Sequence, residues 1–293
     1  MGLWGKFMDI IVTGAKGQLG YDVIKELSKR GHNPIAADID EMDITSESSV
    51  NSFFAGQKNV DAVIHCAAYT AVDLAQSNAE TCMLVNAQGT KNIVNAAKNA
   101  DAKLVYISTD YVFDGEGDTP WQPDDDDKRA PLNVYGESKY QGELYVEKYE
   151  KSFIVRIAWV FGKNGKNFVD TVLRLAKEHD TLNFVNDQIG TPTYTYDLSR
   201  LLVDMVESTK YGKYHATNEG GYISWYDFVL EILKQAGIQG KTVHPVTSGQ
   251  FKSAAKRPHN SRMDKSKLAL NGFAPLPDWK DALSRYLKET GEV

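Results

Sequence analysis

The chain has 293 residues, which is enough for one large α/β domain or for two lobes. Its composition, 42% hydrophobic and 25% charged residues, is typical of a soluble globular protein. A net charge of −6 gives no overall attraction for nucleic acid or for an anionic membrane, so neither is an expected partner.

The cysteines and the start of the chain indicate a cellular compartment. Cys66 and Cys82 show no metal-binding or redox spacing and predict reduced thiols in a cytoplasmic protein. No apolar run reaches the length of about 18 residues that a membrane span needs. The first residues are too short and too weakly apolar a stretch for a signal peptide. Because Met8 directly precedes the first strand-like run, residues 1–7 are expected to be an extension without a function.

The first half of the chain alternates short apolar runs with longer periodic segments. Strands are predicted at 8–13, 33–38, 60–68, 103–109 and 153–162. Helical periodicity fills the intervals at 19–31, 46–57, 80–100 and 133–150. The strand runs are almost continuously apolar, as expected of parallel strands that are covered on both faces. This alternation predicts an α/β fold with a Rossmann-like, doubly wound parallel sheet.

The pattern becomes less regular after about residue 163. Residues 183–208 indicate a strand, a loop and a helix, and Ser224 is the predicted N-cap of a further helix. The acidic run at 124–128 is expected to be a solvated loop. We expect a smaller C-terminal lobe that closes over the sheet.

A glycine-rich turn, TGAKGQLG, joins the first strand to the first helix and contains Gly14, Gly17 and Gly20. Glycine permits positive φ and close backbone approach, and the following helix offers free N–H groups to a pyrophosphate. In this position, the motif predicts dinucleotide binding. Residues 8–162 and about 190–220 are therefore the expected dinucleotide-binding domain, and about 163–189 and 221–293 the substrate-binding lobe.

Asp38 ends the second strand, 18 residues after Gly20. This is close to the offset at which a carboxylate binds the adenosine ribose hydroxyls. A carboxylate there would repel the 2′-phosphate of NADPH and therefore favours NADH as the cofactor. Lys16, beside the turn, keeps NADPH as an alternative. Asp40 is the alternative ribose carboxylate, although it lies beyond the end of the strand.

The strongest functional signal is a set of separate motifs. With the glycine turn, HCAAYT (65–70), VNAQGT (85–90) and Tyr135-x-x-x-Lys139 resemble the extended short-chain dehydrogenase/reductase superfamily. Further motifs resemble the family of dTDP-4-dehydrorhamnose reductases. They are AAYTAVD (67–73), STDYVFDG (108–115), PLNVYGESKYQGE (131–143), RIAWVFGKNGKNFV (156–169), NDQIGTPT (186–193) and RPHNSRMD (257–264). The resemblance runs from about Met8 to the C-terminus.

The resemblance implies NAD(P)H-dependent reduction of the C4 ketone of dTDP-4-dehydro-6-deoxy-L-mannose to dTDP-L-rhamnose. Tyr135 would give the proton, and the Lys139 ammonium would lower the pKa of Tyr135 and hold the nicotinamide ribose. Thr109, at the end of the fourth strand, would hydrogen-bond the ketone oxygen. Taken alone, the Tyr–Lys spacing favours an ordinary amphipathic helix, and the accompanying motifs reverse this preference.

Other residues carry over from the family motifs. Those that resemble cofactor contacts are Gln18, Leu19, Asp43, Ile44, Ala67, Ala68, Tyr69 and Thr70. Those that resemble substrate contacts are Val72, Asp110, Trp159 and Arg257, the last for the diphosphate because arginine offers a bidentate fork. Asn86 resembles the helix asparagine that organises the active site.

Two other functions stay open. A related nucleotide-sugar epimerase or 4,6-dehydratase shares the motifs, but a dehydratase needs a carboxylate pair beside the catalytic threonine, and only Asp110 follows Thr109 here. A non-catalytic regulatory subunit of the same fold is the second alternative, although it need not keep Thr109, Tyr135 and Lys139 together. The reductase reaction needs no metal, and a monomer or homodimer is expected.

Overall fold

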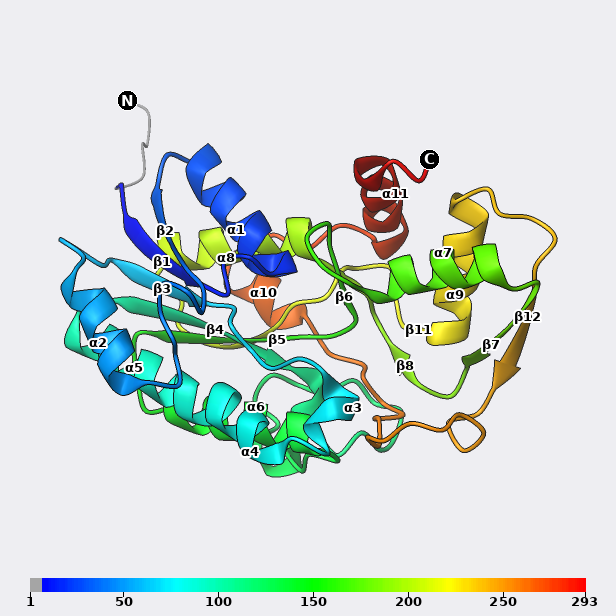
Figure 1. Ribbon diagram of the computed structural model, residues 1–293, viewed down its shortest axis with the longest axis horizontal. Coiled ribbons are helices and arrows are strands. Elements are labelled where there is room, and N and C mark those ends of the chain that lie inside the picture. The colour runs from blue at the N-terminus through cyan, green and yellow to red at the C-terminus, as the bar shows by residue number, and fades with distance from the viewer. Residues whose placement is uncertain (1–6) are drawn as a thin grey trace.

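Six parallel strands form the central sheet of the protein, in the order β10-β5-β4-β3-β1-β2 (Figure 1). The structure is a computed structural model that describes residues 7–293, so all but Phe7 of the predicted extension lies outside the described residues. The sheet strands are β1 (Asp9–Thr13), β2 (Asn33–Ala37), β3 (Ala62–His65), β4 (Lys103–Thr109), β5 (Ser152–Ile157) and β10 (Gly212–His215). The predicted Rossmann-like, doubly wound sheet is confirmed. The order in which successive strands are added reverses between β1 and β3, and α/β sheets bind ligands at such a point.

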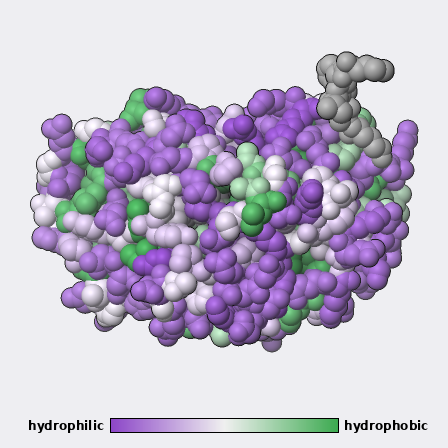
Figure 2. Space-filling view, turned by 180° about the vertical axis from the view of Figure 1, so that it is seen from behind, coloured by the Kyte–Doolittle hydropathy of each residue, from purple (hydrophilic) through white to green (hydrophobic). Residues whose placement is uncertain are grey.

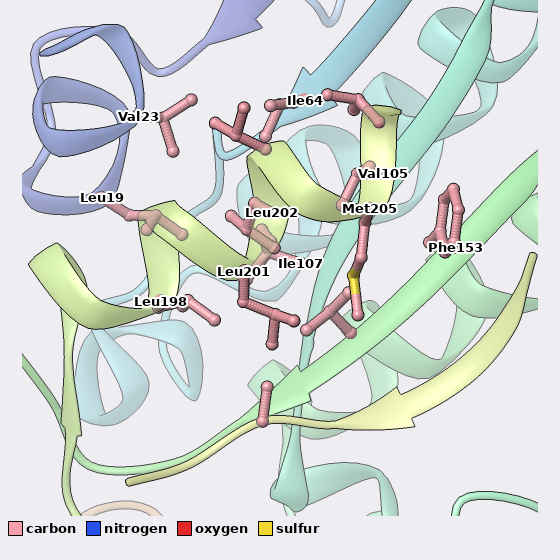
Figure 3. Packing of buried hydrophobic residues seen from close by; sticks show 14 of the residues in the cluster. Leu19, Val23, Ile64, Val105, Ile107, Phe153, Leu198, Leu201, Leu202 and Met205 are labelled. Atoms are coloured by element: carbon pink, nitrogen blue, oxygen red, sulfur yellow. The ribbon is translucent and has the colours of Figure 1, made fainter. Parts of the chain in front are cut away.

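Helices cover both faces of this sheet because its strands are apolar on both sides. These helices are α1 (Gln18–Lys29), α2 (Glu47–Ala55), α3 (Val72–Ala75), α4 (Ala79–Met83), the π-helical turn η1 (Leu84–Gly89), α5 (Thr90–Asn99), α6 (Val134–Val146), α8 (Thr195–Glu207) and α10 (Ser266–Leu270). One core joins the sheet to α1 and α8, and Figure 3 shows side chains of all three, among them Val23, Leu202 and Val105, gathered in it. The second core joins the opposite face to α2, α5 and α6.

A second cluster of elements comes from the chain after β5, interrupted by α8, β10 and α10, and lies beside the sheet in Figure 1. Its elements are β6 (Val160–Phe161), α7 (Phe168–Glu178), β7 (Thr181–Val185), β8 (Ile189–Gly190), β9 (Thr193–Tyr194), β11 (Ile223–Ser224), α9 (Trp225–Gln235), β12 (Thr242–Val246) and α11 (Trp279–Thr290). A separate aromatic-rich core, which includes Phe161, Phe228 and Tyr286, holds these elements together. Ser224 caps α9 in a capping box with Asp227, as predicted.

One local prediction was wrong. The apolar run 153–162 is not one strand, because Trp159 takes the left-handed conformation, with φ 51°, and separates β5 from β6. The acidic run at 124–128 is largely exposed, as predicted. It contains the short 3₁₀ turn η3 (Asp126–Lys128), in which Asp126 pairs with Lys213 of β10. A second 3₁₀ turn, η2 (Asp110–Val112), follows β4.

The face of the protein seen from behind in Figure 2 is predominantly polar. Figure 2 shows the back face covered mainly by hydrophilic residues, with scattered hydrophobic ones between them. Within residues 7–293, no helix combines the length and the apolar character that crossing a membrane requires.

Candidate active site

A cavity of about 1730 Å³ lies at the carboxyl ends of the sheet strands and extends between the sheet and the second cluster of elements. Sites for one small molecule typically measure roughly 300–1,000 Å³, so this cavity has room for a dinucleotide and a second ligand. It includes the point between β1 and β3 at which the strand order reverses. Position and size both favour a two-ligand site.

Nearly all residues singled out from the sequence line this cavity. They are Gly14, Gly17, Gln18, Leu19, Gly20, Asp38, Asp43, Ile44, Ala67, Ala68, Thr70, Val72, Thr109, Asp110, Tyr135, Lys139, Trp159 and Arg257. Tyr69 and Asn86 lie outside the lining, in direct contact with each other.

The glycine turn has the geometry that close approach of a ligand needs. Gly14 adopts φ 63°, and a Cβ there would lie 2.8 Å from the backbone of Ala67. A Cβ on Gly20 would collide with the carbonyl of Gly14, so this glycine lets α1 start against the turn. Gly17 precedes α1 in extended conformation, and no side chain of the described residues caps the helix. The first N–H groups of α1 are thus available to an anion.

The carboxylate at the end of β2 is held in place by the backbone. The Asp38 side chain accepts hydrogen bonds from the N–H of Lys16 and of Ile39, both at 2.9 Å. The Lys16 ammonium instead pairs with Asp40, at 2.7 Å. Of the two carboxylates proposed for the ribose, only Asp38 lines the cavity, and it faces it from beside the glycine turn.

Tyr135 lies at the centre of the candidate catalytic group. Asn133 caps α6 by accepting a hydrogen bond from the N–H of Gly136 at 2.8 Å, which places Tyr135 in the first turn of the helix. Its hydroxyl lies near the Thr109 side chain, which favours the ionised form of the phenol. Burial and, next, the nearby Asp110 raise the pKa of Tyr135, although the contact with Thr109 opposes this.

Lys139 is not a surface residue: it is 3% exposed, one turn beyond Tyr135. Its ammonium lies 4.1 Å from the ring centroid of Tyr106. Burial lowers the pKa of Lys139 from 10.5 to about 7, against the opposing effect of Glu143. The expected net lowering of the pKa of Tyr135 is therefore not found in the protein alone, because burial outweighs the other contributions.

Asp110 adds a second buried acid to this group. It is 2% exposed, and its Oδ1 accepts a hydrogen bond from the Thr109 hydroxyl at 2.9 Å. Burial raises the pKa of Asp110 to about 6, while hydrogen bonds from Ser261 and Thr109 oppose the shift. The Thr109 hydroxyl thus lies between a phenol and a carboxyl group.

Asn86 joins the cofactor side of the cavity to α6. Its side-chain oxygen accepts from the N–H of Tyr69 at 2.7 Å, and its amide donates to the Tyr69 carbonyl at 3.0 Å and to the Ser138 hydroxyl at 2.9 Å. Ser138 in turn donates to the carbonyl of Tyr135 at 2.7 Å. Asn86 therefore acts on the site indirectly, through the loop that contains Ala67, Ala68 and Thr70.

Aromatic residues form the far wall of the cavity. The Trp159 ring stacks on Trp225 with centroids 3.7 Å apart and an angle of 15° between the planes. Phe168 contacts Trp225 at 4.3 Å between centroids. Phe168 and Trp225 also line the cavity, and neither was among the site residues predicted from the sequence. For Trp225, the sequence signal was the predicted N-cap Ser224. This cap fixes the start of α9 but not the direction of the Trp225 side chain.

Arg257 also lines the cavity but is already paired. Its guanidinium binds the Asp73 carboxylate in a bidentate pair, at 3.1 and 2.7 Å. The predicted arginine fork is thus present and aimed by Asp73, which also accepts from the N–H of Ala255 at 3.0 Å. An anion that binds Arg257 would share it with Asp73.

Comparison with known proteins identifies relatives that agree with one another. The model of the RmlD substrate binding domain family matches residues 8–291. A dTDP-4-dehydrorhamnose reductase of Aggregatibacter actinomycetemcomitans is 39% identical over 288 residues, which cover 94% of this chain and 96% of that protein.

Two solved structures resemble the whole chain. The dTDP-4-dehydrorhamnose reductase of Clostridium acetobutylicum is 40% identical, with a TM-score of 0.92 over 97% of this chain and 100% of that one. The dTDP-4-dehydrorhamnose reductase of Bacillus anthracis, solved in complex with NADP, shows the same identity, TM-score and coverage.

Proposed function

The chain belongs to the RmlD substrate binding domain family, and from this premise we propose that it reduces dTDP-4-dehydro-6-deoxy-L-mannose to dTDP-L-rhamnose with NAD(P)H. The observation that carries the proposal is the meeting of Thr109, Tyr135 and Lys139 in a cavity that the glycine turn also enters. The dTDP-4-dehydrorhamnose reductases among its relatives match nearly their full length.

The residues at the cavity fit a nicotinamide dinucleotide. The Gly14–Gly20 turn and the start of α1 would hold its pyrophosphate, and Asp38 would bind the adenosine ribose. When bound, the nicotinamide supplies the hydride for the ketone carbon. Since a relative binds NADP and Lys16 lies beside Asp38, the assignment covers both nicotinamides, with NADH favoured by Asp38.

The chain's own residues then handle the ketone oxygen. Tyr135 stays protonated because burial and Asp110 raise its pKa, so it is a proton donor over a broad pH range. The Thr109 hydroxyl, close to that of Tyr135, would share the ketone oxygen with it. Once the proton leaves, the Lys139 ammonium on the next turn would stabilise the phenolate.

We also propose roles for the rest of the cavity. Val72, Asp110 and Trp159 would contact the sugar, and Arg257, aimed by Asp73, would bind the diphosphate. The sheet domain would bind the dinucleotide, and the cluster around α7, α9 and α11 the substrate. The described residues hold both cysteines as free thiols, which fits a cytoplasmic monomer or homodimer.

The test is oxidation of NADH and NADPH by the purified protein, followed at 340 nm, with dTDP-4-dehydro-6-deoxy-L-mannose as substrate. We expect oxidation that depends on this sugar and that Tyr135→Phe reduces by about 10²–10⁴-fold. Oxidation with a different keto sugar, but not with this one, would overturn the proposed substrate. Release of an isomer without net oxidation would favour an epimerase instead.

A further inference from the structure

A buried ion pair lies directly behind α6, the helix that contains Tyr135 and Lys139. The side chains of Glu143 and Arg156 are both 0% exposed. Arg156, on β5, donates to the two carboxylate oxygens at 2.8 and 2.7 Å, which is the strong bidentate geometry. Burial opposes the charge on Glu143, but Arg156 outweighs it and lowers the pKa of the carboxyl group.

The Glu143 carboxylate connects the three elements that contain the site. On β4, the Ser108 hydroxyl donates to Glu143 at 2.5 Å, immediately before Thr109. On α6, Glu143 follows Lys139 by four residues and therefore lies on the same face of the helix. On β5, Arg156 lies three residues before Trp159, which lines the cavity. One charged group thus fixes β4, α6 and β5 against each other.

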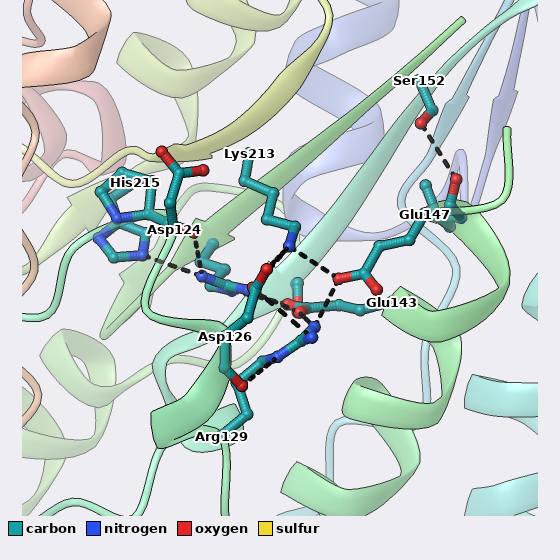
Figure 4. Close-up of polar contacts among 12 residues, drawn as sticks. Asp124, Asp126, Arg129, Glu143, Glu147, Ser152, Lys213 and His215 are labelled. Atoms are coloured by element: carbon teal, nitrogen blue, oxygen red, sulfur yellow. Dashed lines mark hydrogen bonds and ion pairs between the residues drawn. The ribbon is translucent and has the colours of Figure 1, made fainter. Parts of the chain in front are cut away.

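The segment around the acidic run seals this ion pair from solvent. Arg129, with a side chain only 6% exposed, donates to Glu143 at 3.2 Å and to Glu147 at 2.6 Å. The Pro123 carbonyl accepts from Arg156 at 3.0 Å. Figure 4 shows Arg129, Lys213 and Asp126 gathered around the two glutamates. The two residues that flank the exposed acidic run thus contact the buried ion pair.

Fold stability alone does not account for this arrangement. A buried ion pair typically contributes no more than well-packed apolar residues of similar size, because desolvation offsets the attraction. The groups that surround Lys139 suggest a different use. Those with an effect on its charge or its position are Glu143, Cys66, Cys82, Tyr106 and His65. Of these, Glu143 is the foremost group that favours the ammonium form.

Resting on the proposed reductase function, we propose that Glu143 is a positioning residue for the reaction. Held by Arg156, its carboxylate lies one helical turn beyond Lys139 on the same face, where its negative charge favours the Lys139 ammonium. Through Ser108, it also fixes the end of β4, so that Thr109 stays beside Tyr135. Glu143 itself touches neither ligand, since it lies outside the cavity lining.

The test is the pH profile of kcat/KM for Glu143→Gln against the parent enzyme. Without the carboxylate charge, Lys139 should lose its proton at lower pH, so the alkaline limb should move to lower pH by about one unit. At pH 8, kcat/KM should fall by about tenfold or more. Parent-like values of both quantities would overturn the proposal.

Two further variants separate charge from structure. Glu143→Asp keeps the charge, so its alkaline limb should coincide with that of the parent; a limb shifted as in the glutamine variant counts against the proposal. Glu147→Gln is the matched control, because Glu147 contacts Arg129 and Lys213 one turn further from Lys139. It should keep the parent profile, and a shifted limb there would show that the effect is not specific to Glu143.

Ser108→Ala keeps the proposal testable if the glutamine variant does not fold. It removes only the hydrogen bond at 2.5 Å and leaves the ion pair in place. We expect kcat to fall by about threefold or more at an unchanged KM for the nicotinamide; an unchanged kcat would contradict the positioning role. An inactive parent enzyme would refute the proposed function instead, so the two failures are distinguishable.

Discussion

Replacing Lys139 by Met should stabilise the fold and abolish the activity. Lys139 is 3% exposed, and burial lowers its pKa from 10.5 to about 7. At about 1.4 kcal/mol for each pKa unit, that lowering corresponds to roughly 5 kcal/mol of cost for folding with the ammonium charged. Lost contacts with Tyr106 offset part of this gain, and we expect the variant to be more stable by roughly 2–4 kcal/mol near neutral pH.

The stability difference between Lys139→Met and the parent should change with pH in a defined direction. Between about pH 7 and pH 10.5, the unfolded chain binds the Lys139 proton and the folded chain does not, so the parent gains stability as the pH rises through this window. Below pH 7, the parent carries the full cost. The stability difference between Lys139→Met and the parent should therefore be largest below pH 7 and shrink as the pH approaches 10.5.

Urea unfolding of both proteins, followed by tryptophan fluorescence at about pH 6.5, 8 and 9.5, measures this difference. Other titrating groups cancel because they are common to both proteins. Lys148→Met, at an exposed position just after the same helix, is the matched control and should change stability little at any pH. A difference for Lys139→Met that stays constant with pH, or a net loss of stability near pH 6.5, would refute the reasoning.

Three further predictions concern the ligands. Thr109→Val should lower kcat by about 10²-fold, measured at saturating substrate, because the ketone oxygen loses a hydrogen-bond donor; a parent-like kcat would remove Thr109 from the reaction. Asp38→Ala should shift the ratio of kcat/KM for NADH and NADPH toward NADPH by about tenfold; an unchanged ratio would remove Asp38 from the ribose site. Arg257→Met should raise the KM for the dTDP-sugar by about tenfold or more, since charged hydrogen bonds contribute about 1.5–3 kcal/mol. Arg174→Met, at an exposed site, is its control, and equal KM values for the two variants would contradict the diphosphate role.

The parts of the site that could be predicted are those set by local sequence. Strand, turn and helix follow one another at Gly14–Gly20, and parallel strands end at one edge of the sheet, so Asp38 and Thr109 had to face the same cavity. The N-cap at Asn133 then fixes where Tyr135 and Lys139 lie on their helix.

The remaining features depend on contacts between distant residues, which local patterns do not determine. Trp225 meets Trp159 only when α9 packs against the turn after β5. In the sequence, Arg156 lies in a strand pattern and Glu143 in a helix pattern, and neither position differs from many others. Their pairing depends on the folded chain, in which the segment around the acidic run covers them. The raised pKa of Tyr135 and the lowered pKa of Lys139 could not be predicted for the same reason, since burial is a property of the whole fold.

The central claim is that Tyr135 protonates the ketone of a dTDP-linked sugar that a nicotinamide reduces. The most direct measurement is a single assay of dTDP-4-dehydro-6-deoxy-L-mannose with NADH and NADPH, for the parent and for Tyr135→Phe, with the product identified by mass spectrometry. We expect one nicotinamide oxidised for each dTDP-L-rhamnose formed by the parent, and loss of both in the variant. Equal turnover by the two proteins, or no turnover of this sugar by the parent, would contradict the account.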